Sequence, residues 1–381
     1  MKYLSEAVGV PKNIIPAAKE IEVLLAEFVE KIQDPYQKTS ETFNKLDLSI
    51  ASENNSKQTK IDQVKFSYRP STNLHPLKDP CVCTGISIDR EQRIKGNKIV
   101  FTGPKNSLHI NIYLKFHSKE CSKDQVSECI LNYCTVSVIA HELKHKFDVD
   151  ANNIIEFKKF LDYQAKARAL MNPSDILTIG AFSEFLFNSY FVSDIESSVY
   201  AVELAAEMSE QKTKKVEFYK FLKSTSIYQT LLNCRNYVYE SFYIKLSEDQ
   251  DVIENLLEVN GIDSNISNEQ IAKEAIKLFF QEISKASEKE IKSLCKGEDQ
   301  ERFLKQFQKE ARKHQDNPFA YFKKACDEIA VKGEKVFKKI AKIYSLAESV
   351  EPRLHCAFLV EPRPLNMTFA DYFKSKQKNN S

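Results

Sequence analysis

Residues 134–148 read CTVSVIAHELKHKFD and combine a helical hydrophobic pattern with two histidines four positions apart. The apolar residues recur at spacings of three and four: Val136, Ile139, Leu143 and Phe147. This pattern predicts a helix that buries one stripe against a core. His141 and His145 fall on an adjacent face, one turn apart, so both imidazoles can reach a single ion.

The segment His141-Glu-Leu-Lys-His145 is an HExxH motif. Imidazole nitrogens are common ligands of Zn²⁺, and a zinc ion lowers the pKa of a bound water towards 7. Glu142, next to the first histidine, is placed to take a proton from that water as it attacks a carbonyl. The motif therefore predicts a zinc site in which Glu142 is the catalytic base.

A catalytic zinc usually has three protein ligands and one open position, so a third ligand is needed. A metzincin has a histidine six residues after the second one, but Ala151 occupies that position. The best candidate is Glu196, in the first turn of a helix expected over 194–210, where small residues permit a close approach. The alternatives are Glu203, Glu184 and Asp148. Asp148 and Glu203 are also candidates for a second role, in which they would orient a ligand side chain without contacting the metal.

HELKH (141–145) and the downstream DIESSVYAVE (194–203) together resemble the gluzincins, the thermolysin-like class of zinc peptidases. The resemblance implies His141, His145 and Glu196 as ligands, Glu142 as general base, and a donor that stabilises the oxyanion, for which Tyr200 and Tyr190 are candidates. It also implies that strand 108–114 is an edge strand that borders the cleft and pairs with an extended substrate. The sequence departs from the pattern at Tyr200, where thermolysin-like enzymes have Asp.

Two further stretches, YLSEAVGVPKNIIPAAKEI near the start and GEKVFKKIAKIYSLA near the end, resemble uncharacterised metallopeptidase-like proteins of tailed bacteriophages. The many Lys, Asn and Ile residues are compatible with a phage source. This resemblance implies a location in the cytoplasm, including that of an infected host cell, or in a virion.

The order of elements predicts an α+β, zincin-like fold: a small mixed or antiparallel sheet, the HExxH helix, and a large mainly helical remainder. Strands are expected within 61–68, 86–88, 98–101 and 108–116. Helices are expected over 127–149, 153–171, 194–210, 214–223, 227–243, 268–290, 298–314 and 318–348. We divide the chain into an N-terminal helical segment (1–58), the sheet and HExxH helix (59–150), a helical subdomain with the third ligand (151–245), a C-terminal helical region (246–372) and a disordered tail (373–381).

Composition excludes several classes of protein. A formal net charge of +2 gives no bulk attraction to nucleic acid or membranes. No apolar run approaches the roughly 20 residues of a spanning helix, and the start lacks the pattern of a signal peptide. The nine cysteines have irregular spacing, which favours buried free thiols in a reducing compartment. The expected partner is a peptide or protein substrate, and the sequence does not specify an oligomeric state.

The expected function is peptide-bond hydrolysis by a zinc-bound water that Glu142 activates. The alternative is a catalytically silent protein with a zincin fold, for instance a structural or interaction component of a phage virion, which the many helices after residue 210 favour. Hydrolysis of a non-peptide amide, such as a cell-wall crosslink, would use the same site.

Overall fold

The computed structural model describes residues 10–344 except 53–54, 73–80, 89–91, 102–105, 118–119, 153, 172–173, 212–217 and 263–265. The fold is α+β, as predicted, with a small mixed sheet and many helices. The chain forms two compact units. Unit 1 comprises Met1–Phe157, Ser198–Ile227 and Lys342–Leu346, and unit 2 comprises Lys158–Ser197, Tyr228–Ala341 and Ala347–Ser381.

Unit 1 contains a four-stranded sheet in the order β1-β2-β6-β3. Its strands are β1 (Thr39–Ala51), β2 (Gln58–Thr72), β3 (Cys81–Ile88) and β6 (Ser107–Phe116). The β2–β6 pair is parallel, whereas the other two pairs are antiparallel. A second sheet joins β4 (Gln92–Lys95), β5 (Lys98–Phe101) and β7 (Ile154–Glu156).

Two expectations about the sheet were wrong. The first 58 residues are not only helical, because β1 occupies Thr39–Ala51. The strand before the HExxH helix, β6, is not an edge strand, since it pairs with β2 on one side and β3 on the other. Its backbone is therefore not open to an extended substrate. Among the described strands, the edges of this sheet are β1 and β3.

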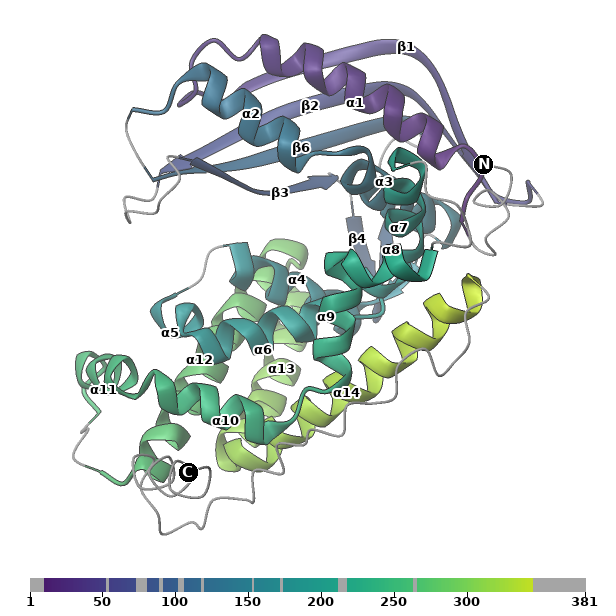
Figure 1. The fold of residues 1–381 in the computed structure, drawn as a ribbon. Coiled ribbons are helices and arrows are strands. Elements are labelled where there is room, and N and C mark those ends of the chain that lie inside the picture. Colours follow the sequence, from purple (N-terminus) through teal and green to yellow (C-terminus); the bar gives the residue numbers. More distant parts are fainter. Residues whose placement is uncertain are drawn as a thin grey trace. The chain divides into compact units, whose positions relative to one another are not determined.

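The helices of unit 1 are α1 (Ile14–Glu30), α2 (Lys123–Tyr133), α3 (Val136–Asn152), α7 (Tyr200–Glu210) and α8 (Phe218–Ser224). Figure 1 shows α1 and α2 lying side by side across one face of the sheet. Ser122 and Gln125 form a capping box at the start of α2. The helix expected over 127–149 is instead two helices, because the chain leaves the helical conformation at Cys134.

Helix α3 carries the HExxH motif and packs against α1 and α7. The predicted apolar stripe of Val136, Ile139, Leu143 and Phe147 is buried, which confirms that face of the helix as part of the core. Burial of side chains of this size contributes about 1.5–3 kcal/mol each. The position of His141 and His145 is therefore set by a helix that the core holds firmly.

Unit 2 is helical, and its core contains a cluster of five phenylalanines: Phe182, Phe185, Phe242, Phe279 and Phe322. Its helices are α4 (Phe157–Met171), α5 (Asp175–Thr178), α6 (Gly180–Phe191), α9 (Ser226–Arg235, which begins in unit 1), α10 (Tyr239–Glu248), α11 (Gln250–Val259), α12 (Asn268–Leu294), α13 (Glu298–Asp316) and α14 (Pro318–Ile343). The ring centroids of Phe185 and Phe242 each lie 4.2 Å from that of Phe322.

The expected tail at 373–381 lies outside the described residues. Within the described part of the chain, every helix is too short or too polar to cross a lipid bilayer.

Candidate metal centre

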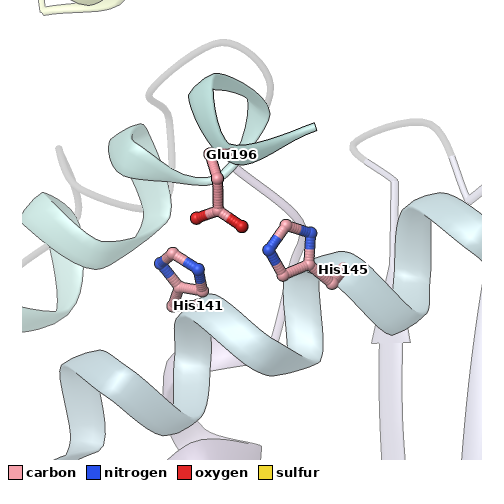
Figure 2. Close-up of side chains that lie close together, drawn as sticks. All are labelled: His141, His145 and Glu196. Atoms are coloured by element: carbon pink, nitrogen blue, oxygen red, sulfur yellow. The ribbon is translucent and has the colours of Figure 1, made fainter. Parts of the chain in front are cut away.

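His141, His145 and Glu196 form a group in which one ligand atom from each side chain lies within 4.8 Å of the others. These are the three residues that the sequence analysis proposed as ligands. Figure 2 shows the carboxylate of Glu196 directed towards both imidazole rings. Among the described residues, this is the one group of three or more His, Cys, Asp or Glu side chains that meets this distance.

The two histidines come from successive turns of α3. Their ring centroids are 4.9 Å apart with an angle of 76° between the rings, so one ring presents its edge to the other. His145 is only 4% exposed, whereas His141 is half-buried. An ion held between them would thus be shielded from water on the His145 side.

Glu196 begins the short turn η1 (Glu196–Ser198), whose last residue already belongs to unit 1. The hydroxyl of Ser193 accepts a hydrogen bond from the Glu196 backbone N–H at 3.3 Å, which closes this turn. Ser198 then donates from its hydroxyl to Asp148 Oδ2 on α3, at 3.1 Å. This bond ties η1 to the helix that carries the histidines. Glu196 is 4% exposed.

A second carboxylate, that of Glu203, contacts His141 at Nδ1. Oε2 of Glu203, on α7, lies 2.8 Å from Nδ1 of His141. An ionised carboxylate can only accept a hydrogen bond, so this contact places a proton on Nδ1 and leaves the lone pair of Nε2 for an ion.

Two tyrosine hydroxyls donate hydrogen bonds to the same oxygen of Glu196. Tyr163, on α4, and Tyr190, on α6, each lie 2.8 Å from Oε1, and the two hydroxyl oxygens are 3.3 Å apart. Their rings stack with centroids 5.3 Å apart. Burial raises the pKa of Tyr190 well above its usual value, so its hydroxyl stays protonated and remains a donor. The two hydrogen bonds hold Oε1 of Glu196 and so fix the orientation of its carboxylate.

The other candidates lie in different surroundings. Tyr190 uses its hydroxyl on Glu196, and Tyr200 is buried with its ring centroid 6.3 Å from that of His141. Glu184 pairs with Lys245, and the polar contacts of Asp148 are with Lys144 and Ser198. Among the proposed third ligands, Glu196 is the one that forms a group with both histidines, whereas Glu203 contacts His141 at Nδ1.

Sequence reasoning missed Tyr163. Its position in α4 lies 33 residues before Glu196, and nothing in the local pattern of that helix distinguishes it from an ordinary packed tyrosine. A buried carboxylate needs hydrogen-bond donors. A search for tyrosines whose hydroxyl could donate to Glu196 would therefore have identified candidate residues.

The donor set of two imidazole nitrogens and one carboxylate oxygen suits Zn²⁺ with an open coordination position. The same set also binds other first-row divalent ions, iron(II) included. The geometry therefore supports a metal centre and does not distinguish among these ions.

Comparisons with models of protein families, with curated proteins and with solved structures found no match.

Proposed function

We propose that the chain is a zinc-dependent peptidase of the gluzincin type, with His141, His145 and Glu196 as the metal ligands. The observation that carries the proposal is the meeting of the HExxH histidines with a buried carboxylate from a distant turn. A structural zinc site is usually closed by four protein ligands, whereas three ligands leave a position for water or substrate. The three-ligand group therefore favours catalysis.

A zinc ion bound there would polarise a substrate carbonyl and lower the pKa of a water molecule bound to it. Glu142 is half-buried on α3, next to His141. We assign it the role of accepting a proton from the attacking water and delivering that proton to the leaving amine nitrogen. Glu203 holds the proton on His141 Nδ1, and the two tyrosines hold the carboxylate of Glu196.

A site for an extended substrate is also part of the proposal. Because β6 is an interior strand, the strand that can accept a peptide is β3, an edge of the described sheet that contacts both α2 and α3. Main-chain hydrogen bonds to such an edge would bind peptides with little regard to sequence.

The test is hydrolysis of a broad peptide library by the zinc-loaded protein, with and without a chelator. We expect cleavage that the chelator abolishes and added zinc restores. Glu142→Gln should reduce turnover about 10²–10⁴-fold while zinc remains bound at one equivalent. Glu128→Gln, at an exposed position of α2, is the matched control and should cleave like the wild type.

A folded, zinc-loaded protein that cleaves no peptide would contradict the proposal and support the catalytically silent alternative. Cleavage that survives the Glu142→Gln change would reject Glu142 as the base, even if the metal is required.

A further inference from the structure

Five of the nine cysteines gather in unit 1 where β3 meets α2: Cys81, Cys83, Cys121, Cys129 and Cys134. They take no part in the candidate metal centre. Cys129 Sγ accepts a hydrogen bond from the backbone N–H of Cys83 at 3.0 Å and approaches the carbonyl oxygen of Cys81 at 3.7 Å. The side chains of Cys83 and Cys134 are hydrogen-bonded to each other.

Two sulfurs in this cluster, those of Cys81 and Cys121, approach each other closely. Their Sγ atoms are 3.2 Å apart, and both residues are 6% exposed. A disulfide bond is about 2.05 Å long, so a small side-chain movement would bring these sulfurs to bonding distance.

A thiolate metal site fits the cluster less well. Four sulfurs at about 2.3 Å from a tetrahedral zinc are about 3.8 Å from one another, so every pair must be close. Within the described residues, no three cysteine sulfurs lie within 4.8 Å of each other. The 3.2 Å between the Cys81 and Cys121 sulfurs is shorter than the separation that a shared zinc ion would impose, and this favours a bond over an ion.

We propose that Cys81 and Cys121 are a redox-active pair that a small disulfide compound oxidises to an intramolecular disulfide bond. One thiol, as the thiolate, attacks a sulfur of the oxidant and releases one half of it as a thiol. The second protein thiol then attacks the mixed disulfide, forms the Cys81–Cys121 bond and releases the other half. Two protein thiols are oxidised, one disulfide compound is reduced, and the two protons end on the released thiols.

The bond would join the first residue of β3 to the residue before Ser122, the N-cap of α2. It would close a loop between positions 40 apart in the chain. Because α2 leads directly into α3, the bond would fasten the start of this helical pair to the sheet. Burial raises the pKa of Cys81, so the exchange is slow at neutral pH and faster under alkaline conditions.

The experiment treats the full-length protein with hydroxyethyl disulfide at about pH 8.5, alkylates the remaining thiols after denaturation, and maps the peptides by mass spectrometry. We expect a linked pair of peptides that contain Cys81 and Cys121, and two fewer alkylated thiols. The midpoint of thermal unfolding should rise by about 5 °C and return to its starting value on reduction.

The matched variants are Cys121→Ala, which should form no such link, and Cys129→Ala, which should form it like the wild type. Peptide mapping of the wild type decides the question even if a variant does not fold. Full alkylation of Cys81 and Cys121 after oxidation, or a link from Cys81 to Cys129, would overturn the proposal. So would a chelatable ion that protects the cluster from alkylation. None of these outcomes depends on peptidase activity.

Discussion

His141 Nδ1 and Glu203 Oε2 lie 2.8 Å apart, which joins the first histidine of the HExxH helix to helix α7. The contact selects the tautomer of His141 that has its proton on Nδ1 and its lone pair on Nε2. A metal ligand whose second nitrogen is bonded in this way has a fixed ring orientation and a more basic donor atom.

Two substitutions of Glu203 should weaken zinc binding to different extents. Glu203→Gln retains an oxygen that accepts the proton of Nδ1 but removes the charge, and Glu203→Ala removes both. We expect the zinc dissociation constant to rise from wild type to Gln to Ala, by about 10–100-fold in Ala. Competition with a chromophoric chelator measures this dissociation constant. Glu210→Gln, at an exposed position of the same helix, should bind like the wild type. Equal affinities for all three proteins would show that the contact does not support the site.

Loss of Glu196 should remove a metal ligand directly. Glu196→Ala leaves two histidines, and metal analysis of the purified protein should show far less than one equivalent of zinc. Asp194→Asn is the control, because Asp194 lies two residues away and makes an exposed pair with Lys159 at 3.2 Å. Stoichiometric zinc in the Ala variant would move the third ligand to another residue.

The two tyrosines on Glu196 should act as a pair. Hydrogen bonds to a charged group contribute about 1.5–3 kcal/mol, so Tyr190→Phe or Tyr163→Phe should each weaken zinc binding about 10-fold or more. Since the two hydroxyls contact each other as well as Oε1, the double variant should lose less than the sum of the single losses. A double-mutant cycle by titration calorimetry tests this, with Tyr243→Phe, a substitution in α10, as the control. Strict additivity would mean that the two phenols act independently.

Glu207 should make stability depend on pH. Burial, with the nearby charges of Glu203 and Glu210, raises the pKa of Glu207 to about 7. Because the folded pKa lies above the unfolded one, the folded state binds the extra proton between about pH 4.5 and 7, and stability falls as the pH rises through this window. Glu207→Gln should therefore raise the unfolding midpoint at pH 8 and change it little at pH 4.5. A variant with the same effect at both pH values would rule out this titration as the cause.

Much of the fold was predictable because its signals are local. The spacing of apolar residues in 134–148 predicted a helix with one buried stripe, and the burial of Val136, Ile139, Leu143 and Phe147 confirms it. The break at Cys134 was missed, since a helical hydrophobic period can continue across a short interruption. The position of β6 inside the sheet was also missed, because strand order depends on partners far away in the chain.

By itself, the sequence determined that His141 and His145 share a helix face, because the helical repeat places residues i and i+4 side by side whatever surrounds them. It also indicated Glu196 from its turn and its small neighbours. Only the tertiary structure decided that the carboxylate of Glu196 lies beside both histidines and that the carboxylate of Glu203 contacts His141. It also decided that Tyr163 and Tyr190 donate hydrogen bonds to Glu196. The physical reason is that these contacts join residues from separate helices and turns, and packing of the core, rather than any local repeat, sets the distances between them.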